Sequence, residues 1–187
     1  MLNVTATRSA RTAGFSLVEL LVALLISSFL LTGIITAYVG IKGLVEDSEN
    51  LQESQEVVRF AMQVFSRSIK NASTQPTLNA GQLTISHTYA ASQAPIVTCQ
   101  GNRVTANVTE VYSFSAPDIL CDDGQGSGAI PVITNVTELG FTLMDINGNG
   151  VNDMVAVRVN TAGMPGNFPN GVELRYAMHS LVLSGGA

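Results

Sequence analysis

The chain has 187 residues, of which 12% are charged, and its formal net charge is −5. This length leaves room for one modest domain beside the long apolar segment described next. Beyond Asn71, only Arg103, Arg158 and Arg175 stand against eight acidic residues. That balance argues against a nucleic-acid-binding face, which needs clustered basic side chains, so no nucleic-acid partner is expected.

The first element in the chain is a long apolar run. From Leu20 to Ile41 the sequence contains no charged residue. As a helix rising about 1.5 Å per residue, this run reaches roughly 33 Å, enough to cross a bilayer core of about 30 Å. Arg8 and Arg11 precede the run, and no acidic residue occurs before position 19, so we expect the amino-terminal end to stay cytoplasmic.

One carboxylate, Glu19, interrupts this pattern at its start, within Gly14-Phe15-Ser16-Leu17-Val18-Glu19. A charge at the centre of a membrane costs about 2.5–3.5 kcal/mol, so we expect Glu19 to have a partner. The alternative is an ordinary signal anchor with a chance acid near its end. An ordinary secretory signal, however, has a small-residue cleavage site after a shorter apolar core, and here that order is reversed.

With its basic leader and long apolar helix, this six-residue segment resembles the cleavage and methylation motif of type IV prepilins and type II secretion pseudopilins. The resemblance implies that a prepilin peptidase cuts between Gly14 and Phe15 and that the new amino group of Phe15 is N-methylated. It further implies that Glu19 of one subunit pairs with the methylated amine of a neighbouring subunit. Such pairing is physically reasonable, because a lone buried carboxylate is penalised and a paired one is tolerated.

Helical periodicity continues beyond the apolar run. Charged side chains after position 51 fall mostly on one face, opposite an apolar stripe. No proline occurs before Pro76, so we expect one helix over residues 15–71, with residues 15–41 as the transmembrane and assembly segment. The expected stripe consists of Leu51, Val57, Val58, Ala61, Met62, Val64, Phe65 and Ile69.

The part of the expected helix after position 51 narrows the resemblance to one group of pilins. The segments Leu51–Glu53, Arg59–Ala61 and Phe65–Ile69 are similar to a run in PilW-type minor pilins. The match departs at Ser68, where that family often shows Asp, and many major pilins carry Pro where this chain has Thr36. We therefore interpret the chain as a minor pilin of a type IV pilus, or fimbrium, that primes or caps pilus assembly. A minor pseudopilin of a type II secretion system and a pilus-carried adhesin or ligand-binding module remain open alternatives.

The resemblance also implies partners and a location. The expected partners are prepilin peptidase, other pilins and minor pilins, the inner-membrane assembly platform and the membrane itself. Residues 1–14 would be a cleaved leader. The mature chain would cross the inner membrane once with a periplasmic head, and would then enter the pilus fibre or its tip at the cell surface.

Residues 72–187 have the pattern of a β-rich head. Alternation with a period of two, broken by Gly, Pro and Asp turns, predicts strands there. The expected strands are residues 83–89, 103–108, 110–114, 132–143, 154–160 and 172–183. We expect the last three to be the longest and to form an antiparallel sheet against the helix stripe. The predicted fold class is therefore α+β, with a long N-terminal helix packed by its second half on an antiparallel sheet.

The head contains the two cysteines of the chain, Cys99 and Cys121. In an oxidising compartment such a pair favours a disulfide over a metal site or a nucleophile. Closing a loop of this size contributes roughly 3 kcal/mol. Two separate thiols remain the alternative, since sequence shows no geometry.

One loop has ligand-like spacing. Asp145, Asn147, Asn149 and Asp153 occupy the first, third, fifth and ninth positions, with Gly at the sixth, as in extracellular calcium-binding loops. The twelfth position is Ala156 rather than a bidentate Glu, so any Ca²⁺ affinity should be weak. The alternative is a plain hairpin turn, which two Asn-Gly pairs between strands also predict.

The sequence offers little for catalysis. His87 and His179 are the only histidines, and each lies in a strand-like alternation, so we expect both to face solvent. The glycine-rich stretch 124–128 lacks the Lys and the following helix of a phosphate loop. We therefore predict that this protein is not an enzyme and requires no cofactor, apart from the candidate Ca²⁺.

Overall fold

The computed structural model of the chain describes residues 14–146 and 148–179. The chain divides after Glu46 into two compact units. We call them the amino-terminal unit, up to Glu46, and the head unit, from Asp47 onward. The expected helix over residues 15–71 is confirmed, because α1 runs from Leu17 to Lys70.

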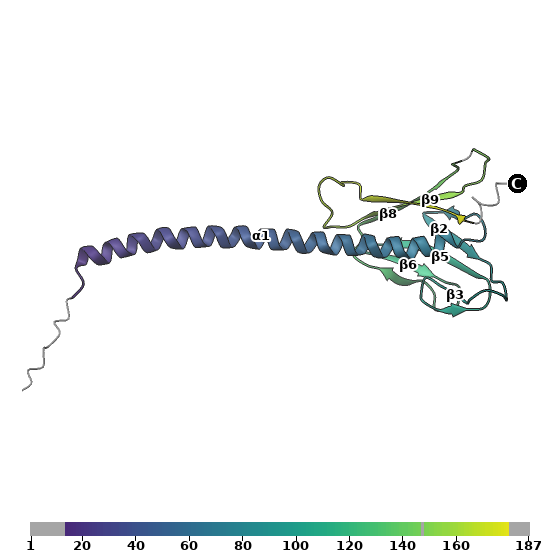
Figure 1. Ribbon diagram of the computed structural model, residues 1–187, viewed down its shortest axis with the longest axis horizontal. Coiled ribbons are helices and arrows are strands. Elements are labelled where there is room, and N and C mark those ends of the chain that lie inside the picture. The colour runs from purple at the N-terminus through teal and green to yellow at the C-terminus, as the bar shows by residue number, and fades with distance from the viewer. Residues whose placement is uncertain (1–13, 147, 180–187) are drawn as a thin grey trace, which may run out of the picture. The chain divides into compact units, whose positions relative to one another are not determined.

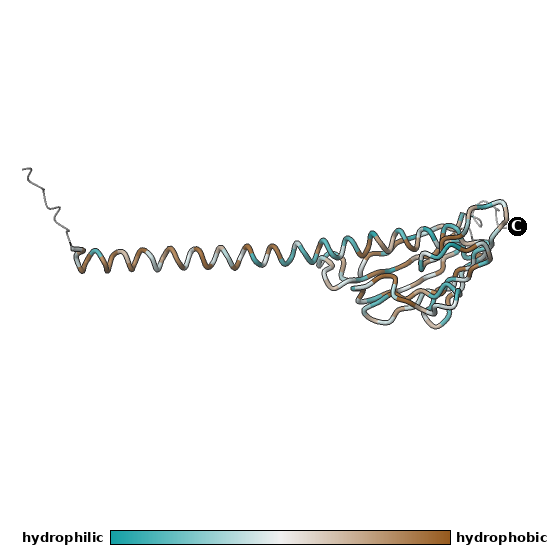
Figure 2. The backbone as a smooth tube through the Cα atoms, turned by 90° about the horizontal axis from the view of Figure 1, so that it is seen from below, coloured by the Kyte–Doolittle hydropathy of each residue, from teal (hydrophilic) through white to brown (hydrophobic). Residues whose placement is uncertain are grey.

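In the amino-terminal unit, α1 exposes apolar side chains in all directions. Every described residue up to Glu46 is exposed, and apolar residues (brown in Figure 2) recur on every turn. Three of the hydroxyl side chains on this surface each donate a hydrogen bond to a carbonyl one turn back. They are Ser28 to Leu25 (2.8 Å), Thr32 to Ser28 (2.9 Å) and Thr36 to Thr32 (2.5 Å). The helix therefore satisfies these three hydroxyl groups itself, which suits an apolar environment.

The head unit contains ten strands within the described residues, all in antiparallel pairs. Five of them form a sheet in the order β1-β2-β5-β6-β7, three form a sheet in the order β10-β9-β8, and β3 pairs with β4. The strands are β1 (Thr77–Asn79), β2 (Gln82–His87), β3 (Ile96–Val97), β4 (Arg103–Val104), β5 (Val108–Ser115), β6 (Asp118–Asp122), β7 (Ile130–Ile133), β8 (Glu138–Met144), β9 (Met154–Asn160) and β10 (Val172–Ala177).

One hydrophobic core joins the second part of α1 to both larger sheets. Phe65, fully buried, lies at its centre, with its ring centroid 5.0 Å from that of Tyr112 on β5 and 5.7 Å from that of Phe141 on β8. In Figure 1, β8 and β9 lie above this part of α1, and β3 and β6 lie below it. The predicted α+β class, a helix packed on antiparallel sheet, is therefore confirmed, although the strands form several sheets instead of one.

Polar contacts and a close backbone approach complete this packing. Ser54 is buried on α1 and accepts a 2.9 Å hydrogen bond from the Thr161 hydroxyl after β9. A Cβ atom at Gly163 would lie 2.4 Å from the carbonyl oxygen of Asn50 and 2.7 Å from Oγ of Ser54. Only glycine therefore lets this loop lie against the helix.

Several expectations about the head elements were wrong in detail. The run 103–108 is not one strand, because β4 ends at Val104 and β5 begins at Val108. The run 132–143 is not one strand, because β7 ends at Ile133 and β8 begins at Glu138. The longest strand is β5 rather than one of the last three. The helix stripe is also rotated from its predicted position: Leu51 and Met62 are 38% and 48% exposed, while Ala61, Val64, Phe65, Ser68 and Ile69 are buried.

Candidate processing and assembly site

The residues around the predicted cleavage point begin α1. Ser16 caps the helix, since its side-chain oxygen accepts a 3.3 Å hydrogen bond from the Val18 N–H, and its carbonyl accepts the Leu20 N–H at 3.1 Å. Gly14 and Phe15 precede the first turn, and the Phe15 side chain is 81% exposed. The peptide bond between them is therefore accessible on the surface of the described chain.

Glu19 lies in the first turn of α1 and is exposed. The spacing Ser16-x-x-Glu19 is that of a capping box, and a carboxylate near a helix N-terminus is favoured by the helix dipole. The first residues of the helix thus accommodate an acid without any burial in the isolated chain. That carboxylate remains available to a cationic partner.

The helix that follows is a candidate membrane span. Among the described residues, α1 is the one helix long and apolar enough to cross a bilayer. Its large apolar residues up to Val45 are all at least 49% exposed, Val45 itself being the least exposed. A surface of this extent requires lipid or other apolar helices as its surroundings.

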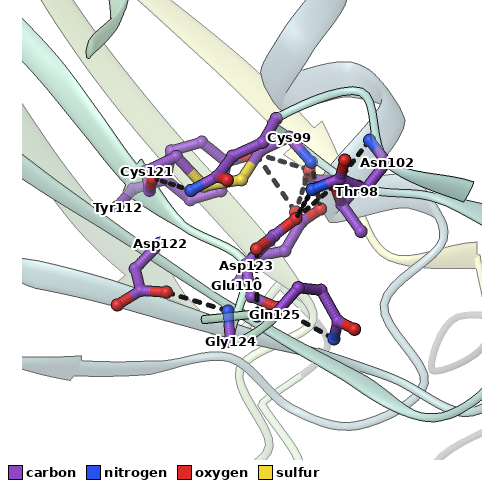
Figure 3. Close-up of a disulfide and its surroundings, with 12 residues drawn as sticks. Thr98, Cys99, Asn102, Glu110, Tyr112, Cys121, Asp122, Asp123, Gly124 and Gln125 are labelled. Atoms are coloured by element: carbon purple, nitrogen blue, oxygen red, sulfur yellow. Dashed lines mark hydrogen bonds between the residues drawn. A yellow bond between two sulfur atoms is a disulfide. The ribbon is translucent and has the colours of Figure 1, made fainter. Parts of the chain in front are cut away.

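The expected disulfide in the head unit is confirmed. Cys99 and Cys121 are joined, with their Cα atoms 6.4 Å apart, and both are buried. Figure 3 shows the bond between β6 and the segment before β4. The side-chain amide of Gln100 donates to the carbonyls of Cys121 (2.8 Å) and Gly128 (2.7 Å), so hydrogen bonds support the same connection.

A second set of hydrogen bonds holds the neighbouring loop. Asp123 is buried and accepts from the Thr98 hydroxyl (2.7 Å), the Asn102 amide (2.8 Å) and the Gln125 backbone N–H (3.1 Å). Figure 3 shows these donors converging on the carboxylate. Burial opposes the charged form, but these hydrogen bonds outweigh it and lower the pKa of Asp123 below its usual value.

Next to the disulfide lies a buried carboxylate, Glu110, that the sequence patterns did not predict as a site. Glu110 is 1% exposed and points into the core from β5. It accepts hydrogen bonds from the Ser68 hydroxyl on α1, from the Cys99 backbone N–H (2.6 Å) and from the Tyr112 hydroxyl (3.1 Å). The Nε2 atom of His87 lies 3.4 Å from the same carboxylate.

Contrary to the sequence-based prediction, His87 is buried, with 6% exposure. It shares its face of β2 with Leu83 and Ile85, and this apolar face covers the core. Burial alone would lower the pKa of His87, but the attraction of Glu110 and the hydrogen bond to the Asn71 carbonyl raise it. Burial likewise opposes ionisation of Glu110, yet the contacts with His87 and Ser68 lower the pKa of that carboxyl. When His87 is protonated, the two groups therefore form a buried ion pair.

The candidate calcium loop connects β8 to β9, so its role as a hairpin turn is clear. Asp145 accepts hydrogen bonds from the backbone N–H groups of Gly148 and Gly150, both at 2.7 Å. Asp153 is buried and accepts from the Ile146 N–H at 3.0 Å, and Asn149 accepts from the Val151 N–H at 2.8 Å.

Asn147 lies outside the described residues. Within the described ranges, no group of three or more His, Cys, Asp or Glu side chains is placed to hold a metal. Calcium binding by this loop therefore stays a prediction.

Two comparisons with known proteins bear on these observations. Residues 9–35 match the family model of the prokaryotic N-terminal methylation motif. No curated protein matches the chain. The match covers Gly14, Phe15, Glu19 and most of the apolar run, so the segment singled out by the sequence is the one that the motif describes.

Proposed function

We propose that this type IV pilin-like protein, which combines the N-terminal methylation motif with a pilin-like fold, is a minor pilin that primes or caps a type IV pilus. The motif implies processing by a prepilin peptidase and assembly with pilins, and marks a structural protein of the pilin type rather than an enzyme. The apolar helix with this motif indicates a membrane-anchored subunit with a periplasmic or extracellular head.

The exposed apolar surface of the amino-terminal unit, headed by one carboxylate, carries this proposal. After removal of residues 1–14, the amino group of Phe15 would start the mature chain, with Glu19 as its fifth residue. In the fibre, Glu19 of one subunit pairs with the methylated amine of the next, and the apolar surfaces of neighbouring helices cover each other. The pairing compensates for burying the carboxylate and fixes the axial position of each helix.

The minor pilin assignment within this class rests on the second part of α1. The segments Leu51–Glu53, Arg59–Ala61 and Phe65–Ile69 are similar to PilW-type minor pilins, and Thr36 stands where many major pilins carry Pro. The buried disulfide of the head unit suits an extracytoplasmic environment, as expected for a pilin of either kind.

Incorporation of a Glu19→Gln variant tests the proposal. The variant should be inserted and cleaved normally but should be depleted at least tenfold from sheared fibres, because the amide carries no charge to pair with the amine. Glu49→Gln, an exposed acid on the same helix, is the matched control and should be incorporated normally. Mass spectrometry of assembled wild-type protein should show a methylated Phe15 as the first residue. Assembled protein that still begins at Met1 would contradict the proposal.

Deletion of the protein separates the pilus from a type II secretion system. For a minor pilin, surface fibres should disappear while secretion of folded exoproteins continues. Loss of secretion with intact fibres would identify the protein as a pseudopilin.

A further inference from the structure

The head unit contains a cleft of about 620 Å³ where α1 ends. One wall is the last turn of α1 with residues 71–73, and another is the segment 93–97, which includes β3. The end of β2, Glu110 of β5 and His179 complete the lining. This volume lies within the range of about 300–1,000 Å³ that is typical of small-molecule sites.

Basic groups gather in this cleft, although the protein as a whole is acidic. Arg67, Lys70 and both histidines of the chain, His87 and His179, line it. The one acid among the described lining residues is Glu110, which is buried and paired with His87. The Glu110 carboxylate faces His87, so the permanent positive charge offered to a ligand comes from Arg67 and Lys70 of α1.

The two basic side chains that α1 contributes to the cleft have no carboxylate partner among the described residues. In the described part of the chain, Lys42, Arg158 and Arg175 each lie within 4.0 Å of a carboxylate, whereas the cleft residues Arg67 and Lys70, like Arg59 and Arg103 elsewhere, do not. Arg67 is held in place, because its Nη2 atom donates a 2.7 Å hydrogen bond to the carbonyl of Thr98. One guanidinium is thus positioned at the cleft while its charge stays unneutralised.

The remaining lining is rich in neutral hydrogen-bonding groups. Asn71, Ser73, Thr88 and Gln93 supply amides and hydroxyls, and the short apolar side chains of residues 94–97 supply the rest. The described lining includes no Phe or Tyr, on which a single-stranded nucleic acid would stack its bases. The cleft therefore favours a ligand with several hydroxyl groups and one negative charge.

We propose that this cleft binds an acidic sugar, a ring of hydroxyl groups bearing a carboxylate as in a uronic acid. The carboxylate lies against Arg67 and Lys70, and the sugar hydroxyls exchange hydrogen bonds with the amide and hydroxyl lining. This binding does not depend on the minor pilin proposal, because it needs only the folded chain and no fibre. It gives the head a recognition role that polymerisation does not require.

The two histidines provide a direct probe, since both line the cleft and the chain has no others. The full-length chain, solubilised in detergent and labelled with [¹⁵N]histidine, is titrated with digalacturonate at fixed pH and ionic strength. The proposal predicts a saturable shift of the ring signals. Galactobiose, the neutral analogue, should bind at least tenfold more weakly. No saturable shift with digalacturonate, or equal shifts with both sugars, would overturn the proposal.

Inorganic sulfate and two variants complete the test. Sulfate that displaces digalacturonate at equal concentration would mark an adventitious anion site only. Lys70→Gln should weaken digalacturonate binding about tenfold, and adding Arg67→Gln should weaken it further. Arg175→Gln removes an exposed cation already paired with Glu173, so it should leave the titration unchanged. Equal affinity of the Lys70 variant and wild type would contradict the proposed carboxylate contact.

Discussion

The two parts of α1 use apolar side chains in opposite ways. Up to Glu46, apolar residues surround the helix and none is buried; after Ser54, most of them form one stripe that the head covers, while Phe60 and Met62 stay exposed. Phe29 and Phe65 show the contrast, with side chains 72% and 0% exposed. The apolar side chains of the first part therefore need lipid or other chains to cover them, whereas those of the second part are covered by the head of the same chain.

This difference teaches how one continuous helix serves two roles. Where apolar residues cover every face, no single orientation is preferred, and specificity must come from a rare polar group such as Glu19. Where one stripe is apolar, the head selects the orientation, and buried polar residues such as Ser54 and Ser68 refine it. Substitutions in the first part should affect assembly, and those in the second should affect folding.

The largest expected effect compares Phe65→Ala with Phe29→Ala. Loss of the Phe65 ring leaves a cavity between the two larger sheets and should lower the free energy of unfolding by about 3–5 kcal/mol. Phe29→Ala should leave it within about 0.5 kcal/mol, as surface substitutions do. Denaturant unfolding of the full chain in detergent, followed by tyrosine near-UV circular dichroism, measures both. Equal losses of unfolding free energy in the two variants would show that the two parts of α1 unfold as one cooperative unit.

Removal of the disulfide should come next. Replacing Cys99 and Cys121 together by Ser should cost about 3 kcal/mol of head stability, because the unfolded chain regains the freedom of the closed loop. The helicity of the amino-terminal unit should not change, since the disulfide lies entirely within the head unit. Hydrogen exchange resolved by region measures both effects. Protection lost equally in residues 20–41 would contradict the expected separation.

A smaller effect is expected from calcium at the loop between β8 and β9. If the loop binds Ca²⁺, a concentration ten times Kd stabilises the head by about 1.4 kcal/mol, which raises its melting temperature by a few degrees. Mg²⁺ should do less, because it demands tighter octahedral geometry. Asp145→Asn keeps an acceptor for the two glycine N–H groups and should remove the response. An unchanged wild-type melting temperature in about 5 mM CaCl₂ would leave the loop a turn only.

The smallest effect should be the pH dependence contributed by the His87–Glu110 pair, because desolvation offsets much of a buried attraction. The raised pKa of His87 gives stability that is present below about pH 6.5 and is lost as pH rises through the folded value. The lowered pKa of Glu110 gives stability that is present above about pH 4.5 and is lost as pH falls through the folded value. The pair therefore contributes most between these limits.

His87→Gln tests this assignment. It should flatten the fall in unfolding free energy above pH 6.5, while His179→Gln, which replaces an exposed histidine, should preserve it. Identical pH profiles for His87→Gln and wild type would assign the dependence to other groups.

Sequence alone predicted the features that follow from periodicity or a short motif. The apolar run and the absence of proline predicted α1 to within two residues at its start and one at its end. The two cysteines predicted their own pairing. These signals are local, or, for the cysteines, allow only one intramolecular partner.

Features set by contacts between distant residues were missed. Glu110 lies on the same face of its strand as Val108 and Tyr112, and His87 on the same face as Leu83 and Ile85. The sequence of each strand therefore did indicate that its charged residue faces the core. A single strand does not reveal that the two buried charges meet. That follows from the register, in which Ile85 lies opposite Glu110 and places His87 diagonally beside it.

The buried serines of α1 have a mechanical consequence. Ser54 and Ser68 are fourteen residues apart, about four turns, so they lie on the same face of the helix. Apolar contacts tolerate a slip by one turn, whereas the Ser54 hydroxyl is bonded to Thr161 and the Ser68 hydroxyl to Glu110, each at a fixed position in the head. A pull along the axis of residues 47–70 must break both bonds together, in shear. A fibre subunit built this way resists sliding of its helix out of its head under load.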